Sequence, residues 1–486
     1  MTFSILHISD LHQNLKDEIL PEVLLDTIAN DFERFSSADP VIPLPNLCVV
    51  SGDIVYGVAP TTKDPSGELE RQYNQANDFL IRLCDRFFDG KRDRVILLPG
   101  NHDVDYPEVI KSGSFLPVPR KAVSKSSLVA ELFSPNSDLR WSWTRLEFFR
   151  IADRAAYDGR LQQFAKFYER FYLGLRTYPL DPSSQFDIFD FPDHGFCLAA
   201  FNSCYRNDPM NRVGTIHPSA LMEACRRLRS PSRAGWCLAS SWHHDIAGGV
   251  GHEDFLDAGF VQHLIDAGVT IGFHGHRHRT DCSDQKNRLG DAPRKMTVIA
   301  AGTLCAGPTN LSPGIPRGFN IVEIDTSAAK GRVHSRQMVN QLQNLPIWGP
   351  GQFVDTSKSF LDFDLSPPVR TRPPALDMQL ILEQASDLSG RRKWREVVDL
   401  LAPIAQHPMA RRFYLDALLE LDDSALTIQC LQEPSNTAEA VIVGAALLES
   451  DLPDQVQRFL GLEIVGDQSD PSLNEIKKRL NRKFAK

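Results

Sequence analysis

The sequence lacks the features of a membrane-spanning or exported protein. No apolar run approaches the roughly 20 residues that a helix needs to cross a bilayer. The first residues, Met1-Thr2-Phe3-Ser4, include no basic segment of the kind that begins a signal peptide. Hydrophobic residues make up 42% and charged residues 24% of the 486 residues, values typical of folded soluble domains. We therefore expect a folded cytoplasmic protein that does not enter a membrane.

Paired cysteines and an excess of positive charge are also missing. The nine cysteines are scattered, without the short paired spacings of a disulfide framework or a zinc knuckle. Lys and Arg number 53 against 62 Asp and Glu, so the formal net charge is −9. Such a chain has no general electrostatic attraction to nucleic acid or to anionic membranes. These absences disfavour a disulfide scaffold and a non-specific DNA-binding protein.

Short apolar runs alternate with amphipathic stretches over the first two thirds of the chain, which is typical of an α/β domain. The periodicity predicts helices at 21–35, 72–88 and 218–228. We expect strands at 4–9, 47–51, 95–98, 197–201, 237–241, 269–273, 296–300 and 319–324. Residues 105–194 are rich in aromatics and are interpreted as a mainly helical insertion. Its aromatic side chains either pack between helices or form a stacking surface for a substrate.

The composition changes after residue 345, where we place the end of the first domain. Residues 346–375 are rich in Pro, Gly and Ser, which predicts an extended linker. Beyond it, apolar periodicity predicts helices at 376–388, 394–405, 410–421 and 438–449. We expect residues 376–486 to form an all-α domain. This domain resembles helical hairpins of the tetratricopeptide type, and binding of a protein partner is its predicted role.

Five of the predicted strands are followed by side chains of the types that bind metal ions in proteins. In chain order these are Asp10 and His12, then Asp53, then Asn101 and His102, then His243 and His244, and finally His276 and His278. The carboxyl ends of strands line one crevice in an open α/β sheet, so these side chains can converge there. Side chains two residues apart share a face of extended backbone, which places Asp10 with His12 and His276 with His278.

Each of these motifs has an ordinary structural interpretation when taken alone. A single Gly-Asp after a strand is usually a turn, and a single His-His pair is more often structural than metal-binding. All five in order, each at a strand end, predict a metal site. Aspartate oxygens and imidazole nitrogens suit Mn, Fe, Zn or Ni. The absence of Cys from the clusters argues against a structural zinc site.

The pattern Asp-X-His, Gly-Asp, Gly-Asn-His-Asp, His and Gly-His-X-His resembles the calcineurin-like metallophosphoesterase superfamily over about residues 1–339. The resemblance implies a two-sheet β-sandwich flanked by helices and two divalent metal ions, of which Mn is favoured. It implies that Asp10, His12 and His278 bind the first metal, that Asn101, His243 and His276 bind the second, and that Asp53 bridges them. His244 is the alternative to His243, because the two are adjacent.

Two metal ions can lower the pKa of a bridging water, so hydroxide is the expected nucleophile. His102 is the expected general acid, with Asp103 as the group that fixes its tautomer. A structural role for His102 is the alternative. Arg277 either contacts a substrate phosphate or forms a surface ion pair.

The segments Ile-Ser-Asp-Leu-His and Ser-Gly-Asp look most like the bacterial cyclic-nucleotide phosphodiesterases of this superfamily. Asp103 stands where protein serine/threonine phosphatases usually carry Glu. We therefore predict a phosphodiesterase, for which this likeness suggests a cyclic-nucleotide substrate, with a DNA or RNA nuclease as the alternative. A different class of protein, a catalytically silent scaffold acting through the helical C-terminal domain, is the third hypothesis. The presence of all seven metal positions weighs against it.

Overall fold

The computed structural model describes residues 2–12, 19–59, 62–133, 137–246, 254–256, 258–286, 294–307, 311, 314–340, 345–353, 356–366, 374–405, 408–466 and 470–484. The chain divides into two compact units, Met1–Arg372 and Pro373–Lys486. Each unit is described by itself.

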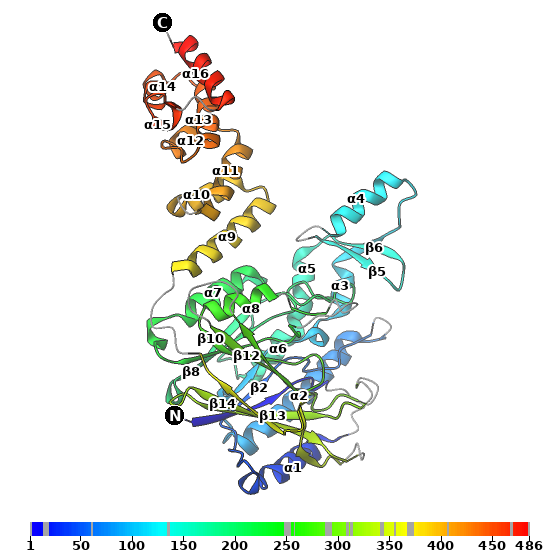
Figure 1. Ribbon diagram of the computed structural model, residues 1–486. Helices are drawn as coiled ribbons and strands as arrows, with labels where there is room; N and C mark the ends of the chain where they lie inside the picture. Colours follow the sequence, from blue (N-terminus) through cyan, green and yellow to red (C-terminus); the bar gives the residue numbers. More distant parts are fainter. Residues whose placement is uncertain are drawn as a thin grey trace. The chain divides into compact units, whose positions relative to one another are not determined.

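Two β-sheets form the centre of the first unit (Figure 1). In the first sheet β1, β2 and β3 run parallel, and β13 pairs antiparallel with β1. Its order is β15-β14-β13-β1-β2-β3, with β16 also beside β14. The strands are β1 (Thr2–Ile8), β2 (Leu47–Val50), β3 (Val95–Leu97), β13 (Gly318–Asp325), β14 (Lys330–Met338), β15 (Trp348–Pro350) and β16 (Phe360–Asp364).

The second sheet has the order β11-β12-β10-β9-β8-β7, with β8, β9, β10 and β12 parallel. Its strands are β7 (Phe186–Phe191), β8 (Phe196–Phe201), β9 (Cys237–Ser241), β10 (Val269–His274), β11 (Asp281–Lys286) and β12 (Lys295–Ala300). Strand side chains alternate between faces. On β8, Phe196 and Leu198 accordingly join the main core shared with the first sheet, whereas Cys197 and Phe201 join a second core.

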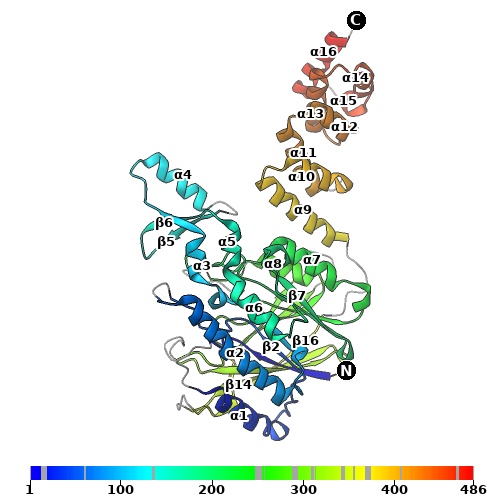
Figure 2. The same ribbon diagram turned by 180° about the vertical axis from the view of Figure 1, so that it is seen from behind.

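Helices cover the outer faces of both sheets (Figures 1 and 2). Residues of α1 (Pro21–Phe32) and α2 (Pro65–Phe87) belong to the main core, and residues of α7 (Pro218–Leu228) and α8 (Ala258–Asp266) belong to the second core. The predicted two-sheet α/β fold is thus confirmed. Helix α2 begins seven residues before the predicted start, because Asp64 accepts a capping hydrogen bond from the Gly67 amide and Pro65 fits the first turn.

The segment predicted to be a mainly helical insertion also contains a three-stranded sheet of order β4-β6-β5. Its elements are α3 (Tyr106–Lys111), β4 (Gly113–Leu116), α4 (Ala122–Leu132), β5 (Leu139–Ser142), β6 (Glu147–Ile151), α5 (Arg154–Asp158) and α6 (Gln162–Phe171). The aromatic side chains of α6, including Phe164 and Phe167, are buried in the main core, as one of our two interpretations requires. By contrast, the side chain of Trp143 is 80% exposed.

Part of the stretch that we predicted to be a linker belongs instead to the first sheet. Strands β15 and β16 both pair with β14, and the intervening Phe353 is buried in the main core. Trp348 in β15 is also buried, with its ring packed edge-on against Phe319 and its Nε1 donating to Oγ1 of Thr27 at 3.0 Å. Burial of these aromatics outweighs the Pro- and Gly-rich composition around them.

The second unit consists of helices around a separate apolar core. They are α9 (Pro374–Gly390), α10 (Trp394–Leu401), α11 (Pro408–Leu421), α12 (Ser424–Cys430), α13 (Thr437–Glu449), α14 (Pro453–Leu460), α15 (Glu463–Gly466) and α16 (Pro471–Phe484). Arg411 forms a two-fold hydrogen-bonded ion pair with the buried Glu439. The all-α prediction is confirmed. Among the residues described, no helix is long and apolar enough to cross a membrane.

Replacing Trp348 by Ala tests whether β15 is part of the folded first unit. We expect a loss of about 3–5 kcal/mol in the free energy of unfolding, since a large buried aromatic leaves a cavity when it is truncated. The neighbouring Ile347 is 48% exposed, so Ile347→Ala should change stability by no more than about 0.5 kcal/mol. Guanidinium denaturation followed by circular dichroism measures both. Equal effects of the two substitutions would contradict the assignment.

Candidate metal centre

Five of the seven predicted metal-binding residues have a left-handed backbone. The φ angles are 52° at Asp10, 45° at His12, 52° at Asp53, 76° at His276 and 58° at His278. For residues other than glycine, such conformations cost about 1–3 kcal/mol each and cluster at functional sites. Gly52, with φ of 95°, precedes Asp53; a Cβ here would lie 2.5 Å from Nδ1 of His243. The turns after β1 and β2 are therefore shaped for close approach of these side chains.

One group of donor atoms gathers at the end of β1. Nε2 of His278 lies 3.2 Å from Oδ1 of Asp10 and 3.1 Å from Nε2 of His12. Nε2 of His12 in turn lies 3.8 Å from Asp10 Oδ1 and 3.8 Å from Asp53 Oδ2. Asp10 and His12 lie together as predicted, through left-handed rather than extended backbone, and the fold adds His278 from the loop after β10. His276, which alternation paired with His278, lies instead with Asn101 and His243.

A second group gathers across the two sheets. Asn101, in the 3-10 turn Asn101–Asp103 after β3, places its Oδ1 3.0 Å from His243 Nε2 and 3.0 Å from His276 Nδ1. The two imidazole nitrogens are 3.3 Å apart. Oδ2 of Asp53 lies 3.3 Å from His243 Nε2, so Asp53 stands between this group and the first. All seven predicted metal-binding side chains are thus brought to one place.

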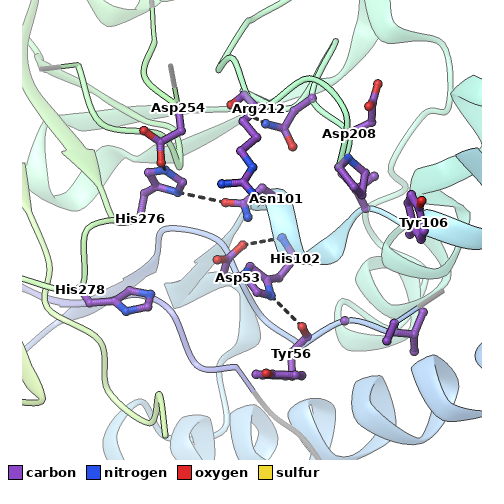
Figure 3. A pocket seen from close by; sticks show the side chains of 16 residues that line it. Asp53, Tyr56, Asn101, His102, Tyr106, Asp208, Arg212, Asp254, His276 and His278 are labelled. Carbon is purple, nitrogen blue, oxygen red and sulfur yellow. Dashed lines mark hydrogen bonds and ion pairs between the residues drawn. The ribbon is translucent and has the colours of Figure 1, made fainter. Parts of the chain in front are cut away.

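The tautomers of two imidazoles are set by acceptors outside these groups. Nδ1 of His243 lies 2.8 Å from the carbonyl oxygen of Ser51, which can only accept, so Nδ1 carries a proton and Nε2 is the nitrogen available to bind a metal ion. Nε2 of His276 lies 3.3 Å from Oδ2 of Asp254 (Figure 3), which leaves Nδ1 facing Asn101. Such carboxylate–histidine contacts are characteristic of metal sites. Sequence analysis missed Asp254, which follows no predicted strand.

His244, the alternative to His243, is directed elsewhere. Its Nδ1 lies 2.8 Å from Oγ of Ser203, and its Nε2 lies 3.0 Å from Nδ2 of Asn207. Its ring is fully buried, and burial lowers its pKa well below the usual value. Both ring nitrogens therefore have partners in the loop after β8. This geometry favours His243 as the ligand.

His102 occupies the rim of the cavity beside Asp53. Its backbone N–H donates to Oδ1 of Asp53 at 2.9 Å, and its Nδ1 lies 2.7 Å from the carbonyl oxygen of Tyr56 (Figure 3). A ring nitrogen of His102 also falls within 4.8 Å of donor atoms of His12 and Asp53. Asp103 does not contact this ring as we expected: it accepts from the Gly100 and Ile54 amides and from the Tyr73 hydroxyl. The Tyr56 carbonyl, and not Asp103, is the acceptor that orients the His102 ring.

Asp53, Asn101, His102, His276 and His278 are among the residues that line a cavity of about 530 Å³. Arg212 points into it, a cation that the sequence patterns did not single out (Figure 3). Arg277 instead pairs with Asp245, so the ion-pair alternative holds for this residue. Asp208, another lining residue, accepts a hydrogen bond from Arg140 at 2.8 Å and is thereby neutralised.

Opposite charges share the buried centre. Burial alone would raise the pKa of Asp53, but His243 above all holds it well below its usual range. Burial would likewise lower the pKa of His243, and Asp53 raises it to about 9. For His12 burial dominates and lowers the pKa to about 3, so this imidazole is neutral at pH 7. His243 must therefore release a proton when it binds a cation, whereas His12 need not.

The donor set fits divalent cations. Carboxylate oxygens, an amide oxygen and imidazole nitrogens converge within 3–4 Å, and two pairs of imidazole nitrogens face one another. Mn, Fe, Zn and Ni accept such mixed oxygen and nitrogen ligands. Asp10, Asp53 and His243 alone offer three ligand atoms within 4.8 Å.

The calcineurin-like phosphoesterase family model matches residues 3–280. The chain belongs to this family. It is therefore a metal-dependent phosphoesterase, and its Asp and His clusters are the candidate sites for the two metal ions that the family uses. A phosphoric ester is its substrate class.

No curated protein gives a significant match to this phosphoesterase. Among solved structures, 63 chains match. A dimetal phosphatase from Danio rerio is 11% identical with a TM-score of 0.37, and the alignment covers 69% of this chain and 96% of that one. GAP50, the anchor in the inner membrane complex of Plasmodium, is 12% identical with a TM-score of 0.34, covering 77% and 93%. The family assignment rests on the match to the family model.

Metal content of two neighbouring variants distinguishes His243 from His244. His243→Ala should lose about one of two bound Mn²⁺ ions per chain, because one metal position loses one of its two imidazole ligands. His244→Gln should retain both, since the native imidazole contacts Ser203 and Asn207. Purified variants are loaded with Mn²⁺, desalted and measured by elemental mass spectrometry, with folding checked by circular dichroism. A folded His244→Gln protein that loses metal would reverse the assignment.

Proposed function

We propose that this phosphoesterase hydrolyses phosphodiesters, with Mn²⁺ as the favoured ion. Asp10, His12 and His278 would hold one ion, Asn101, His243 and His276 the other, and Asp53 would contact both. The convergence of these seven side chains, four of which line the cavity, carries the proposal. When bound, such ions activate water as the nucleophile and neutralise charge on the phosphoryl oxygens.

The charge of the cavity supports a diester over a monoester. A phosphodiester carries one negative charge, whereas a monoester carries close to two at neutral pH. Among the described residues that line the cavity, Arg212 is the single permanent cation, and Asp254 adds a carboxylate beside His276. The side chains outside the metal ligands thus supply little extra positive charge. A monoanionic substrate matches them better than a dianion.

His102 is positioned to act on the leaving group. A carbonyl accepts from Nδ1, which fixes the ring, and the ring lines the cavity. With both nitrogens protonated, the second one can donate its proton to the departing alkoxide. Asp53 holds the backbone of His102 through its N–H, so this proton donor keeps a constant place relative to the metal ligands.

The first test compares bis-p-nitrophenyl phosphate with p-nitrophenyl phosphate. Metal-stripped protein should be inactive toward both, and Mn²⁺ should restore hydrolysis with a higher kcat/KM for the diester. Ni²⁺, Zn²⁺ and Mg²⁺ serve as comparison ions. Cyclic nucleotides and single-stranded DNA are then tested under the best condition, which separates a cyclic-nucleotide phosphodiesterase from a nuclease.

Preference for the monoester would overturn the diester proposal while leaving the phosphoesterase assignment intact. Failure to bind any of these metals would contradict the metal centre itself, and would favour the scaffold hypothesis in which the C-terminal helices bind a partner. Metal binding is therefore measured on the same preparations.

His102→Ala should slow hydrolysis of an alkyl diester about 10²–10⁴-fold, the usual contribution of a positioned acid. The loss should shrink for a p-nitrophenyl ester, because that leaving group departs without a proton. Metal content should stay at the wild-type level. Measuring kcat for both esters, with bound metal on the same samples, checks the three expectations. Loss of metal from the variant would show that His102 is a ligand instead.

A further inference from the structure

A second cavity, of about 730 Å³, lies in the insertion next to the catalytic one. It is bounded by α4, by the β5–β6 hairpin and by part of residues 206–213. The two cavities share no lining residue among those described, but they share this last segment. Asn207, Asp208 and Arg212 line the catalytic cavity, whereas Arg206 and Met210 line the second.

The walls of the second cavity are mainly apolar and aromatic. Trp141 packs edge-on against Trp143 at 6.0 Å and against Phe148 at 5.0 Å between ring centroids. Trp143 is 80% exposed, and Phe133 on the other side is 79% exposed. Exposed aromatic groups gathered around a hollow mark binding sites on soluble proteins. Trp143 and Phe133 therefore do not serve the core, unlike the aromatics of α6.

The charged side chains that line this cavity are all basic. The lining contains Lys125, Arg140 and Arg206, and no acidic residue among the described lining residues. Asp208 neutralises Arg140 from the catalytic side, at 2.8 Å. Arg206 differs: its Nε and Nη2 are buried and, within the described residues, have no hydrogen-bond partner. Arg206 as a whole is half-buried, and a guanidinium partly removed from water without a counter-charge is stabilised when a ligand supplies one.

The surroundings of Arg206 agree with this deficit of negative charge. Burial lowers its pKa most, the Tyr205 side chain partly offsets this, and the neighbouring cations Arg140 and Arg154 lower the pKa further. Its guanidinium carbon lies 5.7 Å from the ring of Tyr205, the aromatic contact recorded for it. An anionic group at this end of the cavity would provide the missing charge.

We propose that the second cavity binds a small amphipathic anion, a carboxylate carried on an alkyl or aryl body. The body would contact Trp141, Trp143 and Phe133, and the carboxylate would be paired with Arg206. A volume of about 730 Å³ is in the range of small-molecule sites. The site is distinct from the metal centre, and the proposal does not depend on the reaction catalysed there.

Isothermal titration calorimetry on the full chain, with octanoate, 1-octanol and acetate, separates the two parts of the proposed ligand. We expect saturable binding of octanoate with one site per chain. Octanol, which lacks the charge, should bind at least about tenfold more weakly, the ratio expected for losing one charge-assisted hydrogen bond. Acetate, which lacks the chain, should show no binding at the same concentrations. Octanoate should also change the tryptophan fluorescence.

Three variants locate the site. Arg206→Gln should weaken octanoate binding about tenfold and leave octanol unchanged, and Trp143→Ala, at an exposed position, should weaken both. Arg82 is an exposed cation of α2 that pairs with Glu22 of α1. The control variant Arg82→Gln should leave all affinities unchanged. Unchanged octanoate affinity in Trp143→Ala would overturn the proposal even if Arg206→Gln fails to fold. Equal binding of octanol and octanoate would also overturn the proposal. So would the absence of octanoate binding, which is the result expected if this surface binds a protein segment.

Discussion

The structure of the catalytic unit is organised by one electrostatic constraint, the burial of two aspartates in the same site. Asp10 is fully buried and Asp53 is 2% exposed, and like charges this close raise each other's pKa. Imidazoles from the opposite sheet compensate: His278 contacts Asp10, and His243 contacts Asp53. Such compensation requires the carboxyl ends of parallel strands in both sheets to meet at one place. The left-handed turns after β1, β2 and β10 provide that approach, at a cost in backbone strain that the packed sheets sustain.

The groups that orient the imidazoles extend this arrangement outward. Two of the three acceptors are main-chain carbonyls, those of Ser51 and Tyr56, and their positions follow from the path of the backbone. The third, Asp254, is a side chain from the segment after β9. Proton positions in the site are therefore governed largely by the fold itself. A cation that binds His243 displaces the proton that the Asp53 carboxylate stabilises on this imidazole, so metal affinity at this position should rise with pH, more than at the neutral His12.

Sequence patterns were sufficient to predict the strands that carry the site. Buried parallel strands appear in a sequence as short apolar runs, and the metal-binding residue types stand directly after them. They could not separate His243 from His244, since that choice depends on Ser203 and Asn207, some 40 positions earlier in the chain. Carbonyl acceptors leave no mark in a sequence at all. Local composition was misleading at residues 346–364, where prolines and glycines suggested a linker but Trp348 and Phe353 are buried against the first sheet. The small sheet β4-β6-β5 was not predicted, because the aromatic residues of this segment are compatible with helices as well as strands.

Residues 206–213 connect the part of the catalytic unit that carries the family motifs with the insertion, which carries none of them. Asp208 lines the catalytic cavity, yet its carboxylate is held by Arg140 and Tyr157 of the insertion, both at 2.8 Å. The packing of the insertion therefore determines where this segment, and Arg212 within it, stands relative to the metal ligands. Metal ligands common to a whole family cannot discriminate one phosphoric ester from another, because they contact only the phosphoryl group that all these substrates share. Selectivity must then come from the cavity wall beyond them, and in this chain the insertion supports that wall.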